Sequence, residues 1–180
     1  QTQSSLFVIA PLAVLGVGGT CDSMRAEDAP QFTRHVQAVF SKLGCSSGAC
    51  HGAVQGKNGF RLSLFAADAT LDYDEIVRDE AGRRINRIQP ENSLILLKAT
   101  ANVAHGGGRR TTTDAAEYQL LLDWIASGAK FDDGQQSQVT KLEVSPRVHV
   151  GGVDGEHHLI VKATFADGST EDVTGLCTFE

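Results

Sequence analysis

The chain has 180 residues, a formal net charge of −6 and an apolar fraction of 41%, values that fit one globular domain or one small domain with part of another. The acidic balance argues against nucleic acid as a partner, because phosphate binding needs clustered lysine and arginine. No apolar run reaches the roughly 20 residues that a membrane-spanning helix needs, so we expect no transmembrane span in the mature domain.

Residues 1–26 have the pattern of a signal peptide or an N-terminal anchor. An apolar run at residues 6–17 is followed by small residues, and the first acidic, polar stretch begins at Glu27. We therefore expect an exported protein that is periplasmic or associated with the cell envelope. Two alternatives are an N-terminal helix of the fold and, less strongly supported, a lipidation site at Cys21.

Residues 27–133 show the periodicity of a helical domain. Its first helix begins near Pro30, which suits a first helical turn, and Gly44 supplies the stop. Apolar residues recur along this segment at the spacing of one buried helical face. They are Phe32, Val36, Val39, Phe40 and Leu43.

Three further helices are expected in the same region. Two short ones correspond to residues 71–80 and 91–100, the second of them preceded by Pro90. A last amphipathic helix opens at Asp114, where a capping-box arrangement is present, and ends at Gly128. The pattern predicts a mainly α fold, in which the first and last helices frame the domain.

The pattern changes after a short polar linker at residues 134–140. Residues 141–180 show apolar and polar residues in alternation, as strands do, and Asp167-Gly168 is a hairpin turn signal. An immunoglobulin-like sandwich needs about 100 residues. We therefore expect this segment to be the incomplete start of such a β domain, within a longer parent protein.

The main chemical signal is the segment CSSGACH, from Cys45 to His51. Two cysteines with a histidine directly after the second suit covalent haem attachment, because the thiols add to the two vinyl groups and the imidazole is placed to ligate the iron. Four residues separate Cys45 from Cys50 instead of the usual two. All four are small, so the longer loop can bulge without steric hindrance.

Three other interpretations of this segment stay open. A disulfide between Cys45 and Cys50 would be natural in an exported protein. A zinc ion would need a further ligand, and the adjacent Cys50 and His51 bind a single ion awkwardly. The spacing could also arise by chance and leave two free thiols.

A second axial ligand is expected from the loop before the last helix, where small cytochromes most often place a methionine. The only methionine of the chain is Met24, in the expected leader. His105 lies at the corresponding place, followed by three glycines, and is the predicted distal ligand. His35, Lys57 and Lys98 are the remaining candidates, and an open iron site with a solvated His105 is the alternative.

Other residues carry weaker signals. Several apolar side chains could wall a haem pocket or form an ordinary core: Phe40, Phe60, Leu62, Leu64, Phe65, Leu94 and Leu97. Four arginines could pair with haem propionates or lie in solvent: Arg83, Arg84, Arg109 and Arg110. The histidines of the β segment are expected to be exposed: His149, His157 and His158.

Residues 32–131 resemble the planctomycete-type c cytochrome domain, through the runs GCSSGACHGAVQGKNGFRLSLF, DYDEIVRDEAGRRI, PENSLILLKAT and AHGGGRR. In that family the four-residue spacing before Cys-His is itself characteristic. The resemblance implies covalently attached haem c on Cys45 and Cys50 with His51 as an axial ligand, in a small class-I-like cytochrome c helical domain. Residues 141–180 resemble the start of the bacterial immunoglobulin-like domains that often accompany this family in large exported proteins.

These observations predict an exported monohaem c-type cytochrome domain that carries single electrons and is not itself an enzyme. Ligation of iron by both His51 and His105 predicts a lower potential than ligation by histidine and methionine, and leaves no vacancy for oxygen or peroxide. One alternative is a five-coordinate, peroxidase-like haem enzyme or gas binder. Another is a haem-free adhesion or scaffold module pinned by a Cys45–Cys50 disulfide. The redox partners are not specified by the sequence.

Overall fold

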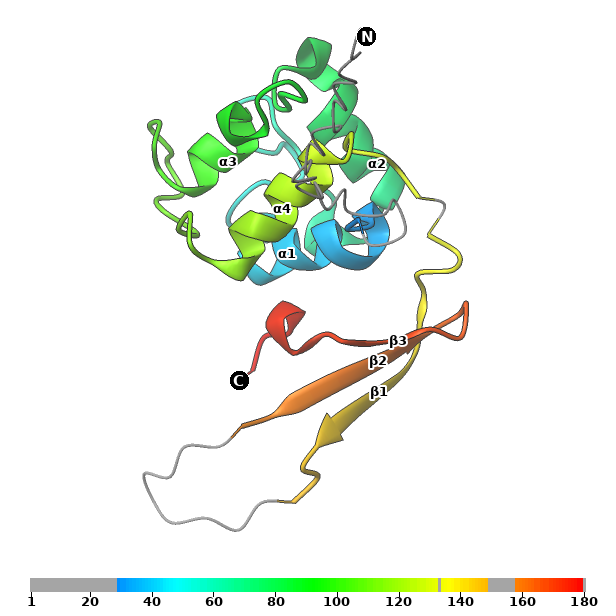
Figure 1. Ribbon diagram of the computed structural model, residues 1–180. Coiled ribbons are helices and arrows are strands. Elements are labelled where there is room, and N and C mark those ends of the chain that lie inside the picture. The colour runs from blue at the N-terminus through cyan, green and yellow to red at the C-terminus, as the bar shows by residue number, and fades with distance from the viewer. Residues whose placement is uncertain (1–28, 133, 149–157, 180) are drawn as a thin grey trace, which may run out of the picture.

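The computed structural model describes residues 29–132, 134–148 and 158–179, and it contains short helices packed beside a small antiparallel sheet (Figure 1). The expected leader at residues 1–26 lies outside the described residues, together with its Cys21 and Met24, and so do His149 and His157. None of the helices in the described part of the chain combines the length and the apolar character that crossing a bilayer requires.

The helical part consists of short segments. In the described residues, the α-helices are α1 (Gln37–Lys42), α2 (Ala69–Tyr73), α3 (Leu94–Ala99) and α4 (Ala116–Ala126). A π-helical turn at Phe32–Val36 leads into α1, and another at Asp74–Arg78 follows α2. Single 3-10 turns occur at Leu64–Ala66, Asp79–Gly82, Pro90–Asn92 and Thr174–Leu176.

The core of the helical part lies between its first and last helices, as the periodicity predicts. Phe32, Val36 and Val39 are completely buried. The Phe32 ring contacts the ring of Trp124 on α4, with centroids 5.5 Å apart, and meets Tyr73 edge-on at 5.2 Å. The predicted apolar face of the first helix is therefore confirmed. Burial of these large side chains supplies the main stabilisation of this part of the chain.

Three antiparallel strands form the sheet, in the order β1 (Val139–Ser145), β2 (Ile160–Phe165) and β3 (Thr170–Asp172). The expected turn at Asp167-Gly168 is confirmed, because it joins β2 to β3. Alternate residues of β2 are buried, and this face packs with the 3-10 turn at Thr174–Leu176. Leu176 also contacts the helical core, so the sheet and the helices share one continuous apolar contact.

A buried arginine links the helices to the sheet. The Arg34 guanidinium pairs with Asp167 at 2.8 Å and with Glu171 at 2.5 Å, and it lies 3.8 Å from the centroid of the Phe165 ring. His35 contacts Glu171 through Nε2 at 2.9 Å. These contacts hold the sheet against the segment that leads into α1, below the helical part in Figure 1.

The expectation of a mainly α, class-I-like cytochrome c fold is wrong, because the described chain is a mixture of short helices and antiparallel sheet. The two predicted middle helices are interrupted. The first gives way to left-handed backbone at Glu80 (φ 52°) and Ala81 (φ 58°). The second is split at Ser93, which is extended (ψ 131°) and accepts a hydrogen bond from the Asn86 N–H at 2.9 Å.

The physical reason for this correction is that helical periodicity is a weak signal over short windows. Side-chain hydrogen bonds to the nearby backbone compete with it, as at the buried Ser93, whose hydroxyl oxygen accepts from the Asn86 N–H. The last helix also begins later than the capping-box pattern indicates, at Ala116, with no side-chain cap at Ala115. The Glu117 carboxylate pairs instead with Lys42 on α1.

Candidate functional site

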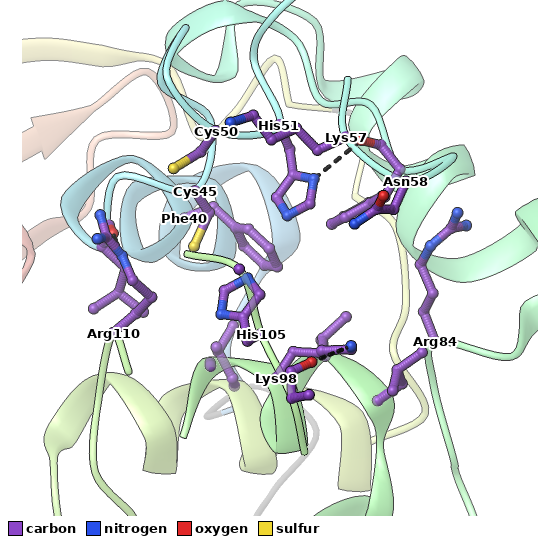
Figure 2. Close-up of a pocket in the computed structure, with 18 of the residues that line it drawn as sticks. Phe40, Cys45, Cys50, His51, Lys57, Asn58, Arg84, Lys98, His105 and Arg110 are labelled. Carbon is purple, nitrogen blue, oxygen red and sulfur yellow. Dashed lines mark hydrogen bonds between the residues drawn. The ribbon is translucent and has the colours of Figure 1, made fainter. Parts of the chain in front are cut away.

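A cavity of about 350 Å³ opens beside the Cys45 to His51 segment (Figure 2). Its size is within the range of ligand sites in proteins. All four predicted site residues line it: Cys45, Cys50, His51 and His105. The fold therefore brings the two cysteines and the two histidines to one cavity, although His105 is far from the others in sequence.

The attachment segment, residues 43–52, curls back on itself after α1. Gly44 has a φ of 73°, which only glycine adopts without strain, and it turns the chain at the helix end. The His51 N–H then donates to the Cys45 carbonyl oxygen at 2.9 Å. A Cβ on Gly52 would lie 2.0 Å from the Ser46 carbonyl oxygen, so this position needs glycine. The four small residues between the cysteines thus form the bulge that the sequence predicts.

The His51 ring has one nitrogen engaged and one available. Its Nδ1 lies 3.0 Å from the Phe60 carbonyl oxygen. A carbonyl oxygen can only accept, so Nδ1 carries the proton and Nε2 presents a lone pair. Burial lowers the pKa of His51 below its ordinary value, and His105, Arg84 and Lys57 lower it further, while the hydrogen bond to the Phe60 carbonyl oxygen raises it. The net shift favours the neutral imidazole, which is the form that binds a metal ion.

His105 is held by the same kind of contact on its own loop. Its Nδ1 lies 2.8 Å from the Gly108 carbonyl oxygen, which leaves Nε2 free. The rings of His51 and His105 lie in nearly parallel planes, 4° apart, with centroids separated by 6.3 Å, and both rings line the cavity (Figure 2). The two rings are too far apart for direct contact, so a space for an atom or group remains between them.

This spacing can be tested against an iron ion bound by two imidazoles. Imidazole nitrogens bind zinc at about 2.0–2.1 Å, and we take a similar bond length for iron. The ring centroid lies about 1.2 Å behind the bound nitrogen. Two imidazoles on opposite sides of one ion therefore have centroids about 6.4 Å apart. The 6.3 Å separation between the His51 and His105 rings agrees with that value. The distance between the two rings is therefore the distance expected for two imidazoles that bind one metal ion.

Both cysteines at the cavity are free thiols and half-buried. Burial raises the pKa of Cys45 to about 11, although the nearby Arg110 guanidinium acts in the opposite direction. The Cys45 thiol is thus protonated at neutral pH. In Figure 2 the two cysteines lie on one side of the paired histidines, and Asn58 and Arg84 lie on the other side.

The cavity is lined by basic and apolar side chains. Its cations are Lys57, Arg83, Arg84, Lys98 and Arg110, and no aspartate or glutamate of the described residues lines it. This is notable in a chain with a net charge of −6. Arg84 is already paired with Asp79 at 2.8 Å, whereas Lys57 and Arg83 make no ion pair within the described residues. The cavity is therefore suited to an apolar ligand that carries negative groups.

The predicted apolar wall is confirmed in part. Phe40, Phe60 and Leu94 line the cavity, and Ile95, Ala99 and Leu121 line it as well, although the sequence did not single them out. Leu62 is buried in the core instead, and Leu64 and Phe65 are exposed. Ile95, Ala99 and Leu121 lie on the same helix faces as core residues of α3 and α4. The hydrophobic pattern of the sequence therefore could not distinguish these cavity residues from core residues.

The other candidate ligands have different positions. His35 is at the contact with the sheet, where Nδ1 accepts from the Gln31 N–H at 2.9 Å and Nε2 binds Glu171, so both ring nitrogens have partners. Lys57 and Lys98 do line the cavity, and Lys98 donates to the Ala104 carbonyl oxygen. His158 is exposed, as expected.

The Phe60 carbonyl that orients His51 was not anticipated. It is placed by the tight turn at residues 56–60, where the Lys57 N–H donates to the Phe60 carbonyl oxygen at 2.9 Å. A Cβ on Gly56 would lie 2.4 Å from the same oxygen. The run GKNG at residues 56–59 indicates a turn. Which donor the Phe60 carbonyl oxygen meets, however, depends on how this loop folds back on the attachment segment.

Among the described residues, no group of three or more histidine, cysteine, aspartate or glutamate side chains is arranged to hold a metal ion. Comparison of the chain with family models, with curated proteins and with solved structures finds no match. The argument for a function therefore rests on the residues of the cavity and their geometry.

Proposed function

We propose that this chain contains an exported monohaem c-type cytochrome domain that carries single electrons within a larger protein. The observation that carries the proposal is the parallel arrangement of His51 and His105, 6.3 Å apart, at a cavity that also contains Cys45 and Cys50. Export is inferred from the pattern of residues 1–26, which suits delivery to the periplasm or cell envelope, where c-type haem would be attached.

The chain's own residues would hold the haem in defined roles. Cys45 and Cys50 would form thioethers with its vinyl groups, and His51 and His105 would occupy the two axial positions. The carbonyl oxygens of Phe60 and Gly108 keep the Nδ1 protons in place, so both Nε2 lone pairs are directed by backbone hydrogen bonds. When bound, the haem supplies a one-electron redox centre.

The cationic lining of the cavity supports the same ligand. Haem carries two propionates, which need charge-assisted partners or solvent. Lys57 and Arg83 line the cavity without ion-pair partners of their own among the described residues. The Arg84 guanidinium already donates to the Asp79 carboxylate and to the carbonyl oxygens of Glu75 and Gly59, and it lies over the Phe60 ring. We therefore assign the propionates to Lys57 and Arg83.

The apolar wall and the double histidine ligation indicate an electron carrier. Phe40, Leu94 and Leu121 would cover the macrocycle and exclude water from its faces. With both axial positions occupied, no site remains for oxygen or peroxide. Imidazole in place of a thioether ligand predicts a lower potential than that of a His/Met cytochrome.

The test is expression of the chain with its leader in a host that matures c-type cytochromes. We expect an intact mass that includes one covalently bound haem, and a pyridine haemochrome spectrum of the c type. The double variant Cys45→Ser/Cys50→Ser should lose covalent haem. The matched control Cys177→Ser, a free cysteine away from the cavity, should retain it.

The second part of the test concerns the iron ligands. His105→Ala should convert the spectrum from six-coordinate low-spin to five-coordinate high-spin, while the haem mass is unchanged. A wild-type protein without covalent haem would refute the cytochrome and leave a haem-free scaffold. A wild-type protein with high-spin haem, unchanged by His105→Ala, would instead support a peroxidase-like or gas-binding site.

A further inference from the structure

Arg110 connects the two loops that carry the histidines. It follows the glycine run at residues 106–108, and its backbone N–H donates to the Ala99 carbonyl oxygen at the end of α3, at 2.8 Å. Its side chain crosses to the attachment segment, where Nε–H donates to the Leu43 carbonyl oxygen at 2.8 Å. In Figure 2 Arg110 lies on the same side of the cavity as the cysteines, opposite Arg84.

The contact is shaped by the residue next to Leu43. A Cβ built on Gly44 would lie 2.6 Å from Nη2 of Arg110, so the guanidinium occupies the space that a side chain would fill. The Leu43 carbonyl is at the end of α1, where no following helical N–H can satisfy it. A charged donor therefore supplies a hydrogen bond that the helix cannot make for itself.

No other hydrogen bond joins the distal loop, residues 100–113, to the attachment segment within residues 29–132. The loop is tied to α3 instead, through Lys98 to the Ala104 carbonyl oxygen and through the Val103 N–H to the Leu97 carbonyl oxygen. A Cβ on Gly106 or Gly108 would meet no heavy atom within 4 Å. The Nδ1 contact of His105 is also internal to this loop, so it does not set the position of the ring relative to His51.

We infer that Arg110 is a positioning residue that anchors the distal loop to the Leu43 carbonyl and so sets the spacing between the His51 and His105 rings. This inference rests on the proposed function, because the spacing matters only if both rings bind one iron. In this arrangement Arg110 acts through the loop, because its Nε–H is engaged by the Leu43 carbonyl oxygen.

The test uses the full chain with covalent haem and measures how readily an added ligand displaces His105. Loss of a charge-assisted hydrogen bond should shift the equilibrium toward unbound His105 by about 10- to 100-fold. Arg110→Ala should therefore bind cyanide about 10- to 100-fold more tightly than the wild type, with the same haem mass. It should also show a high-spin fraction that added imidazole converts to low-spin.

Arg109→Ala is the matched control, because Arg109 is an exposed neighbour with no side-chain hydrogen bond or ion pair among the described residues. It should retain the wild-type cyanide affinity. Arg110→Met is a second variant, since it keeps an unbranched apolar stem and removes the donor to the Leu43 carbonyl oxygen, and it should raise the cyanide affinity as Arg110→Ala does. If Arg110→Ala does not fold, Arg110→Met carries the test.

The outcomes separate this inference from the proposed function. If His105→Ala raises the cyanide affinity but Arg110→Ala and Arg110→Met do not, the positioning role is refuted and double histidine ligation stands. If Arg109→Ala shifts the cyanide affinity as much as Arg110→Ala, the loss of a positive charge explains the shift, and the positioning role of Arg110 is also refuted. If His105→Ala itself changes nothing, the proposed ligation fails first.

Discussion

The two cysteines of the cavity illustrate how burial changes the chemistry of a single residue. Cys45 has a pKa raised to about 11 from an ordinary value of 9.0, because the thiolate would be poorly solvated there. Since the thiolate is the nucleophile, a protonated Cys45 resists alkylation and oxidation. Arg110 partly offsets this effect through its positive charge.

We expect Cys45 of the folded, haem-free chain to be alkylated slowly at pH 8. The raised pKa lowers the thiolate fraction about 100-fold, and the greater nucleophilicity of a more basic thiolate recovers part of this, so the rate should fall roughly 10-fold. Iodoacetamide labelling with peptide mass mapping measures the rate at Cys45. The control is the same chain in urea. Equal rates in the two conditions would contradict the burial of this thiol.

At the scale of the elements, the turn after the cysteines depends on a glycine. Gly52 lies where a Cβ would be 2.0 Å from the Ser46 carbonyl oxygen, 2.7 Å from its carbon and 2.9 Å from the Ser47 carbonyl oxygen. Backbone atoms cannot yield as a flexible side chain can. The position of His51, one residue earlier, therefore depends on the absence of a side chain at Gly52.

Gly52→Ala should reduce the yield of covalently attached haem at least severalfold, because the turn must open to accommodate the methyl group. Gly175→Ala is the matched control, since a Cβ there would meet nothing within 4 Å and Gly175 does not line the cavity. Haem stain intensity per mole of exported chain measures the yield. Equal yields from the two variants would show that the attachment segment tolerates a wider turn.

At the scale of the whole molecule, the sheet is held to the helices by the buried Arg34. Its side chain is 4% exposed and pairs with two carboxylates, while its Nε has no hydrogen-bond partner among the described residues. Asp167 and Glu171 are partly exposed, so they can regain water if the arginine is lost. Hydrogen bonds from Ser169, and next from Arg34, lower the pKa of Asp167 to about 2.

Arg34→Ala should lower the free energy of unfolding by about 2–3 kcal/mol, less than the full cost of stranding a buried charge, because the two carboxylates can be rehydrated. Urea unfolding followed by circular dichroism measures this change. Arg78→Ala is the control, since it breaks the exposed pair with Asp74 and a contact with the face of the Tyr73 ring and should cost no more than about 1 kcal/mol. Similar losses in both variants would argue against a stabilising role for the Arg34 contact.

The sequence by itself determined the local features of this protein. The apolar face of the first helix, the last amphipathic helix, the alternation of β2 and the turn at Asp167-Gly168 all follow from periodicity and turn residues. The cluster of Cys45, Cys50 and His51 was visible for the same reason, because its members are near one another in the chain. His105 was found by its place before the last helix and by the lack of another methionine.

Only the tertiary structure decided how distant segments meet. The 6.3 Å separation of the two histidine rings, the link from Arg110 to the Leu43 carbonyl and the use of Arg34 to hold the sheet join residues far apart in sequence. The expectation of a mainly α fold was wrong because the middle helices are shorter than the periodicity predicts, with left-handed backbone at Glu80 and Ala81 and extended backbone at Ser93. Local propensities are worth fractions of a kcal/mol per residue, and long-range packing and hydrogen bonding outweigh them.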